Sequence, residues 1–174
     1  MGLFSKILSL HRGSIREEDT LTELFASILQ QNNAITHDFL EIIGIVRPIF
    51  AQVATQVFYP KLEGQLLDSR PDLVIKTRHT NEKCDIVFIE SKIRSYEHDD
   101  QLIRYAEQLA KRHEDAQNRY LVYLTRSYDQ KNKYEIKRKT KSSVQFKPLL
   151  WNVVYSLLKK YQKDLLVHEM MVLM

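Results

Sequence analysis

The chain has 174 residues, of which 44% are hydrophobic and 28% charged, proportions that are typical of a folded globular protein. Its one cysteine rules out an internal disulfide bond, and no apolar run reaches the roughly 18 residues that a membrane helix needs. We therefore expect one cytoplasmic domain, and the net charge of +4 is by itself too small to identify a partner.

The first part of the chain predicts two helices, a strand and a loop. Thr20 and Glu23 fit the S/T-x-x-E capping box, and the apolar stripe that follows predicts a helix from Thr20 onwards. A shorter helix is expected over residues 38–43. The sequence next predicts a strand over residues 53–59 and a polar loop over residues 61–70.

Two strong strands follow, over residues 72–76 and 85–92, and both are rich in β-branched and aromatic residues. Both faces of each strand are largely apolar, which predicts central strands that are covered on each side. The connection has turn chemistry around Asn81, so an antiparallel hairpin is the simplest interpretation.

The second half of the chain again alternates between helix and strand. We predict a helix over residues 99–113, a strand over 120–125, a helix over 149–161 and a last helix that reaches Met174. This order predicts an α/β fold with a mixed central sheet flanked by helices and a helical C-terminal end. The apolar residues 170–174 predict packing into the core or an interface, or a chain that is part of a longer protein.

The positive charge is concentrated in one basic band, residues 126–147, where eight basic and two acidic residues give +6. Residues 1–125 carry a net charge of −3, and Tyr128, Tyr134 and Phe146 interleave the band. This pattern is typical of a phosphate-contacting surface, although a solvated lysine-rich loop and strand has the same composition. The candidate nucleic-acid-binding residues are Arg126, Lys131, Lys133, Lys137, Arg138, Lys139, Lys141 and Lys147.

Two acidic residues and a lysine lie at one end of the predicted hairpin. Glu90 and Lys92 share a face of their strand because strand side chains alternate. If the hairpin is symmetric about Asn81, Asp72 falls opposite Glu90, with Cβ atoms roughly 4.5–5.5 Å apart. Carboxylates this close repel unless a proton or cation lies between them, and Mg²⁺ binds such oxygens. Lys92 would then lie beside the metal, where it could activate a water or stabilise charge on a phosphate.

A salt-bridged surface patch of three charged residues on a sheet would give the same pattern. The neighbouring segments 73–75 and 86–89 are apolar on both faces, and charges at the ends of buried strands are usually functional or paired. A hairpin register shifted by one residue would separate the two carboxylates, so the functional interpretation depends on the predicted symmetry.

The motifs Pro71-Asp72 and Glu90-Ser91-Lys92 resemble the signature of the PD-(D/E)XK nuclease superfamily. Gln101 and Tyr105 fit the Q-x-x-x-Y element that exonuclease-like members place on the helix after the lysine strand. Glu23 lies where many members carry an extra acidic metal ligand. The segment from Ile89 to Tyr105 is especially similar to a large, mostly uncharacterised bacterial and phage group within the superfamily.

The resemblance covers about residues 20–125 and implies a restriction-endonuclease-like core with the order αβββαβ. We accordingly expect a single nuclease-like domain over residues 1–174, in which the core is followed by the basic band and by C-terminal helices over residues 149–174. It also implies that Asp72 and Glu90 bind Mg²⁺ or Mn²⁺ together with the backbone carbonyl of Ser91.

The resemblance implies roles for four further residues. Glu23 would bind the metal directly or through a water, and Lys92 would activate the attacking water. Gln101 and Tyr105 would position the active site or a substrate phosphate. The chemistry is metal-assisted hydrolysis, in which the metal lowers the pKa of bound water and fixed charges stabilise the transition state.

The leading hypothesis is a metal-dependent deoxyribonuclease, with RNA not excluded as a substrate and with a possible homodimer. One alternative is a nucleic-acid- or nucleotide-binding regulatory module that has the same fold and does not cleave. Another is a structural or interaction domain in which Asp72, Glu90 and Lys92 only form a salt bridge. Metal binding that disappears in Asp72→Ala would separate the first two hypotheses from the third.

Overall fold

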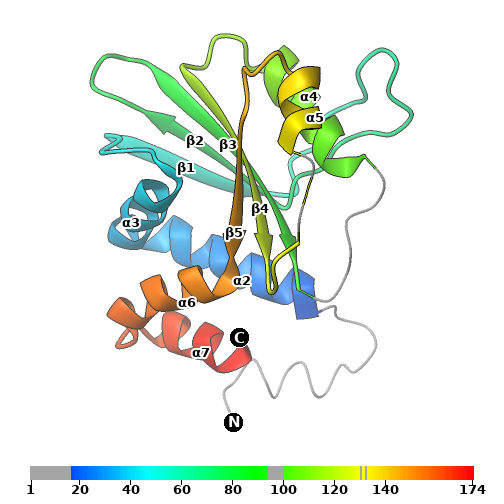
Figure 1. Cartoon of the computed structure of the whole chain (residues 1–174). Coiled ribbons are helices and arrows are strands. Elements are labelled where there is room, and N and C mark those ends of the chain that lie inside the picture. The colour runs from blue at the N-terminus through cyan, green and yellow to red at the C-terminus, as the bar shows by residue number, and fades with distance from the viewer. Residues whose placement is uncertain (1–16, 94–99, 130, 132) are drawn as a thin grey trace.

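The computed structural model describes residues 17–93, 100–129, 131 and 133–174, in which two helices and three strands are followed by alternating helices and strands and a helical end (Figure 1). The elements in chain order are α2 (Glu17–Gln31), α3 (Asn33–Ile43), β1 (Phe50–Thr55), β2 (Leu73–Arg78), β3 (Cys84–Lys92), α4 (Gln101–Arg112), β4 (Asn118–Thr125), α5 (Lys133–Lys139), β5 (Gln145–Leu150), α6 (Trp151–Leu158), the 3-10 turn η1 (Lys159–Tyr161) and α7 (Leu165–Leu173).

One five-stranded sheet lies at the centre of the fold, with the strand order β1-β2-β3-β4-β5. β2 pairs antiparallel with β1 and β3, whereas β4 pairs parallel with β3 and β5. The hairpin register pairs Thr77 with Asp85 and Leu73 with Ile89, so the predicted symmetry about Asn81 is confirmed. Because β3, β4 and β5 run in the same direction, their last residues meet at one edge, which we call the C-terminal edge.

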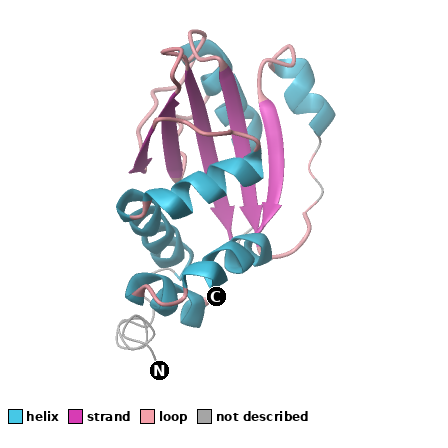
Figure 2. Cartoon of the chain, turned by 90° about the vertical axis from the view of Figure 1, so that its left-hand side faces the viewer, coloured by secondary structure: helices cyan, strands magenta, loops and turns pink. Residues whose placement is uncertain are grey.

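The sheet carries a helical layer on each face (Figure 2), and alternate residues of each strand enter different cores. On one face, Ile89 of β3 belongs to the larger core, which includes Phe25 of α2 and residues of α3, α6 and α7. On the other, which we call the α4 face, Phe88 belongs to a smaller core with Leu109 of α4 and Ile136 of α5. The predicted α/β fold with a mixed sheet and helices on both faces is therefore confirmed.

The first helix begins earlier than the capping box predicts. Residues 17–19 are already helical, so Thr20 lies inside α2 and the box of Thr20 and Glu23 does not start the helix. The second helix begins at Asn33 because the side chain of Asn32 accepts hydrogen bonds from the backbone of its first turn. Both helices are longer than predicted because their starts were set too late.

The strands differ from the prediction at both edges of the sheet. β1 is the segment Phe50–Thr55 and not residues 53–59, and Tyr59 forms only an isolated bridge with Ser69. Residues 149 and 150, predicted as helix, belong to β5, and α6 begins at Trp151. β5 was hard to recognise because Pro148 interrupts it, which an edge strand tolerates.

One side of the apolar C-terminal helix α7 packs into the larger core, while Leu165 and Val172 are exposed. Val167 and Met170 are fully buried in the larger core, and Leu173 and Met174 pack against it. This agrees with the predicted contact between the apolar end and the core. No helix within the described residues is long and apolar enough to cross a membrane.

Candidate active site

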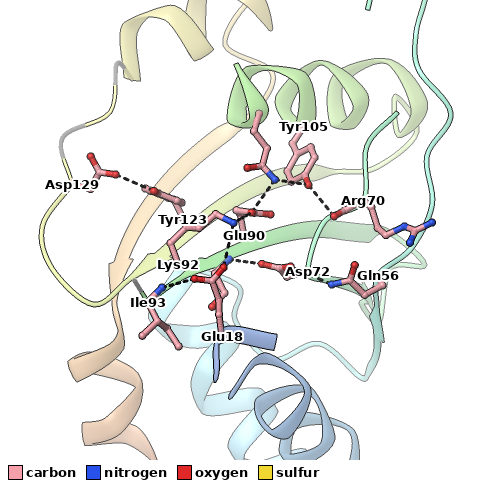
Figure 3. Close-up of polar contacts among 12 residues, drawn as sticks. Glu18, Gln56, Arg70, Asp72, Glu90, Lys92, Ile93, Tyr105, Tyr123 and Asp129 are labelled. Atoms are coloured by element: carbon pink, nitrogen blue, oxygen red, sulfur yellow. Dashed lines mark hydrogen bonds and ion pairs between the residues drawn. The ribbon is translucent and has the colours of Figure 1, made fainter. Parts of the chain in front are cut away.

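The β2–β3 hairpin brings the predicted site residues to the C-terminal edge (Figure 3). Leu73 pairs with Ile89, and the same register continued by one residue sets Asp72 opposite Glu90. Because Val74 and Phe88 face the smaller core, alternation places the side chains of Asp72, Glu90 and Lys92 on the α4 face.

Asp72 is held by two hydrogen bonds, one from a residue of β3 and one from the residue that follows β1. Its Oδ2 accepts from the backbone N–H of Ser91 at 2.8 Å, and its Oδ1 accepts from Nε2 of Gln56 at 3.2 Å. Gln56 follows β1 in the left-handed backbone region (φ 52°), which is uncommon for a residue with a side chain. Burial raises the pKa of Asp72 more than the hydrogen bond from Ser91 and the charge of Lys92 lower it.

Glu90 is the most buried acid of the site, with only 1% of its surface exposed. Its Oε1 lies 2.6 Å from Nζ of Lys92 and accepts a hydrogen bond from Nε2 of Gln101 at 2.9 Å. Its Oε2 is buried and has no hydrogen-bond partner among the described residues. Burial, followed by the charge of Asp72, raises the pKa of Glu90 to about 8 against the opposing effect of Lys92. The positive charge beside Glu90 is therefore too small to keep its carboxylate fully ionised at neutral pH.

Lys92 lies between two acids, one from β3 and one from α2. Besides its contact with Glu90, its Nζ lies 3.5 Å from Oε1 of Glu18. Glu18 also accepts a hydrogen bond from the backbone N–H of Ile93 at 2.9 Å, which fixes α2 against the end of β3. Burial lowers the pKa of Lys92, but Glu90, Glu18 and Asp72 together raise it further, so its pKa lies above the usual value. Lys92 is thus an ammonium ion in this arrangement.

Gln101 and Tyr105 connect the first turns of α4 to this cluster. Nε2 of Gln101 donates both to Oε1 of Glu90 and to the hydroxyl of Tyr105, each at 2.9 Å. The Tyr105 hydroxyl donates in turn to the backbone carbonyl of Arg70 at 2.8 Å. Burial raises the pKa of Tyr105, so its hydroxyl keeps its proton and acts as a donor. This chain of hydrogen bonds fixes the orientation of Glu90.

Glu23 is not brought to the cluster, whereas Glu18 of the same helix contacts Lys92. Glu23 is exposed and lies five residues further along α2, which is about 140° around the helix from Glu18. The capping box predicts a helix that starts at Thr20, and Glu18 lies before that predicted start. The apolar stripe contained the correct signal, because Glu18 lies three residues before Leu21 on that stripe and Glu23 lies outside it.

The donor atoms of the cluster suit a hard divalent cation. Within the described residues no three acidic, histidine or cysteine side chains lie together as a ready-made metal site. Mg²⁺, however, is commonly bound by one or two carboxylates and keeps waters or substrate oxygens as its other ligands. The buried, unpartnered Oε2 of Glu90 and the raised pKa values of Asp72 and Glu90 indicate a carboxylate pair that would gain from such a cation.

The structure distributes the basic band over both faces of the sheet. Arg126 follows β4 at the C-terminal edge, where its backbone N–H donates to the carbonyl of Lys92 at 3.2 Å. Lys147 lies on the opposite face, because it pairs with Val122 of the larger core and its Nζ lies beside Gly44. The other basic residues lie between β4 and the start of β5, in or beside α5, and are Lys131, Lys133, Lys137, Arg138, Lys139 and Lys141. The Arg126 side chain lines a hollow with Leu21, Trp151 and Met174, which belong to or pack against the larger core. The sheet therefore separates Lys147 and the Arg126 side chain from the rest of the band.

Comparisons with known proteins agree with this geometry. A family model described as the PD-(D/E)XK nuclease superfamily matches residues 16–171, which is most of the chain. The match includes Glu18, the hairpin with Asp72, Glu90 and Lys92, and the start of α4. No curated protein and no solved structure gives a significant match.

Proposed function

This chain belongs to the PD-(D/E)XK nuclease superfamily, and we propose that it is a metal-dependent nuclease that hydrolyses phosphodiester bonds in DNA. One observation carries the proposal: a symmetric hairpin sets Asp72 opposite the buried Glu90, and Lys92 on the same strand contacts Glu90. A surface salt bridge does not need a buried carboxylate oxygen without a partner, and Oε2 of Glu90 is such an atom within the described chain.

The metal ligands in this proposal are Asp72, Glu90 and the backbone carbonyl of Ser91, with Glu18 in place of Glu23. Bound Mg²⁺ or Mn²⁺ would polarise the scissile phosphate and lower the pKa of a bound water. The hydrogen bonds from Ser91 and Gln56 hold the Asp72 carboxylate in one orientation, so its ordering does not have to occur during the reaction.

Lys92 would orient the attacking water or stabilise negative charge on the phosphate. Its ammonium group lies between Glu90 and Glu18, so it donates hydrogen bonds and does not accept a proton in this state. Removal of a proton from the water by Lys92 requires that the surrounding carboxylate charge first be neutralised, because that charge raises the lysine pKa. Gln101 and Tyr105 would position Glu90, and Arg126 at the same edge would contact the phosphate backbone.

The decisive experiment compares cleavage of supercoiled, linear and single-stranded DNA, and of RNA, in Mg²⁺, Mn²⁺ and EDTA. Asp72→Asn and Lys92→Met should each lower the cleavage rate by about 10²–10⁴-fold. Lys76→Met is the matched control, because Lys76 is an exposed lysine of β2 away from the C-terminal edge. Cleavage that persists in both site variants would contradict the proposed site. If the protein binds these substrates but cleaves none of them, a non-cleaving nucleic-acid-binding module would be favoured.

A second pair of variants tests which acid of α2 belongs to the site. Glu18→Gln should reduce cleavage, because Glu18 contacts Lys92 and the backbone of Ile93. Glu23→Gln, on the same helix, should leave the rate within about twofold of the unmodified protein, since exposed residues away from a site are usually close to neutral. The opposite result would restore Glu23 to the site.

A further inference from the structure

A hollow of about 650 Å³ lies beside the proposed active site, on the outer part of the sheet. It lies between the segment that follows β4 and the strand β5. Its lining combines two lysines with three aromatic residues, and the residues that carry the argument are Tyr128, Lys131, Lys133, Tyr134 and Phe146. We call it the aromatic groove.

The strand register connects the aromatic groove to Glu90. Glu90 of β3 pairs with Tyr123 of β4, and Tyr123 pairs with Pro148 of β5, which lines the groove. Neighbouring strands lie roughly 4.8 Å apart, so the backbone of Pro148 is roughly 10 Å from that of Glu90. Tyr123 and Glu90 also share a face of the sheet, as Figure 3 shows. A chain of nucleotides that enters the site can therefore reach the groove along one face.

The aromatic side chains of the groove are more exposed than a role in the core requires. Tyr128 is 76% exposed and Tyr134 is 81% exposed, whereas Phe146 is partly buried against the smaller core. Rings that stay in solvent leave their flat faces open to another ring. Stacking of a base on such a face contributes to binding without selecting a sequence, since every base has a π-face.

The charge of the groove suits a phosphate backbone. Lys133 is exposed, and Nζ of Lys131 lies 5.4 Å from the centre of the Tyr123 ring and 3.0 Å from Oδ2 of Asp129. The Tyr123 hydroxyl donates to the same oxygen of Asp129 at 2.9 Å, so this acid orders the lysine beside the site. The rest of the band, including Lys137, adds positive charge beyond the groove.

We propose that the aromatic groove binds single-stranded nucleic acid next to the bond that is cleaved. The inference rests on the proposed nuclease function and names its substrate class. In a duplex each base face is covered by its neighbours, so exposed tyrosine rings have no face on which to stack. In a single strand the bases are free to stack on Tyr128 and Tyr134 while Lys131 and Lys133 contact the phosphates.

The test measures binding in EDTA, so that it does not depend on cleavage. Fluorescence anisotropy compares a labelled oligo(dT) with its duplex with oligo(dA), for the unmodified protein and for the double variant Tyr128→Ala/Tyr134→Ala. The variant should bind oligo(dT) about 5- to 150-fold more weakly for each ring that loses a stacked base. Its affinity for the duplex should stay within about twofold, because phosphate contacts dominate there.

Two controls separate stacking from a general disturbance of the fold. Tyr128→Phe/Tyr134→Phe should keep the affinity for oligo(dT), because it keeps both rings. Phe50→Ala removes a half-exposed ring from β1, at the opposite edge of the sheet, and should change nothing. Unchanged oligo(dT) binding in the double alanine variant, or an equal loss for the duplex, would overturn the inference. If oligo(dT) binding depends on the two rings but the protein cleaves no substrate, the proposed nuclease function would be contradicted and the inference about the aromatic groove would stand.

Discussion

The two ends of β3 each carry a buried carboxylate, and the two carboxylates differ in how they are compensated. At the turn end, Asp85 is 2% exposed, and both of its oxygens are paired, one with Nε2 of His79 at 2.7 Å and one with Nδ2 of Asn118 at 2.9 Å. At the C-terminal edge, Glu90 is 1% exposed and uses one oxygen for both Lys92 and Gln101, while its Oε2 has no hydrogen-bond partner among the described residues.

This difference separates a structural acid from one that is suited to chemistry. A buried polar group whose hydrogen bonds are complete stabilises one conformation, whereas an incomplete one lowers stability unless a ligand completes it. Asp85 belongs to the first kind, because neutral or charged donors reach both of its oxygens. Glu90 belongs to the second kind, and a cation bound by Glu90 and Asp72 would supply what the folded chain lacks.

The largest expected effect is on cleavage, and it should appear at one end of β3 only. Glu90→Gln should lower the rate by at least about 10³-fold, since it removes a proposed metal ligand from the site. Asp85→Asn in the same strand is the matched control and should leave the rate within a few-fold of the unmodified protein. The measurement is the cleavage rate in Mg²⁺ at a temperature where both variants are folded. Equal losses in the two variants would contradict the distinction between the two ends.

The next largest effect is on stability, and we expect it at the turn end of β3 and not at the C-terminal edge. Asp85→Ala removes the buried acceptor of two partly buried donors, Asn118 and His79, which should lower the free energy of unfolding by about 3 kcal/mol. For a chain of this length that corresponds to a fall in Tm of about 6–12 °C. Thermal unfolding followed by circular dichroism measures it. A Tm that falls by less than about 2 °C would show that the hydrogen-bond network at the turn end contributes little.

A smaller effect of opposite sign is expected for Glu90→Gln without metal. Between the ordinary glutamate pKa of 4.5 and the raised pKa of about 8, the folded protein keeps a proton on Glu90 that the unfolded chain has lost. The stability of the metal-free protein therefore falls as pH rises through this range. Because glutamine does not ionise, the variant should be more stable at pH 8 by on the order of 2 kcal/mol, and the difference should disappear towards pH 4.5.

Thermal unfolding in EDTA at both pH values measures this effect. Added Mg²⁺ should then raise the Tm of the unmodified protein and have little effect on Glu90→Gln, because binding to the folded state alone stabilises it. A variant that is equally stable or less stable at pH 8 would show that Lys92 already compensates Glu90 in the absence of metal.

The hairpin was predictable because local rules determine it. The apolar composition identifies the two strands, the turn at Asn81 sets their register, and that register sets Asp72 opposite Glu90. The helix that carries Gln101 and Tyr105 was predictable from its apolar periodicity. These features depend on neighbours in the sequence or on a single pairing, so the sequence contains enough information to locate them.

The missed features depend on contacts between distant segments. Glu18 reaches Ile93 across 75 positions, whereas the resemblance to the family pointed to Glu23 on the same helix. Gln56 reaches Asp72 from a left-handed backbone conformation after β1. A residue other than glycine gives no sequence signal for that conformation. β5 is an edge strand with Lys147 and Pro148 at its centre, so it lacks the apolar alternation that identifies a strand. Local periodicity cannot locate such contacts because tertiary packing selects them.

The smallest expected effect concerns a half-buried base, His113, that packs on β3 between the two acids. His113 packs edge-on against Phe88 in the middle of β3 and against Tyr59, and its Nε2 is buried without a hydrogen-bond partner among the described residues. Burial is the main cause that lowers its pKa, and the charged groups that face it are Lys76, Arg112, Asp115 and Arg119. Below the ordinary pKa of 6.5 the unfolded chain binds a proton that the folded protein resists, so stability falls as pH falls.

His113→Phe should keep the ring contacts and remove this dependence. Between pH 7.5 and pH 5.5 the Tm of the unmodified protein should fall by about 1–3 °C more than that of the variant, measured in EDTA. His168→Phe is the matched control for the substitution itself, because His168 is exposed on α7. If His113→Phe keeps the full pH dependence, His113 does not contribute to it. The middle of β3 would then be insensitive to pH in this range, and the contrast between Asp85 and Glu90 would be confined to the two ends of the strand.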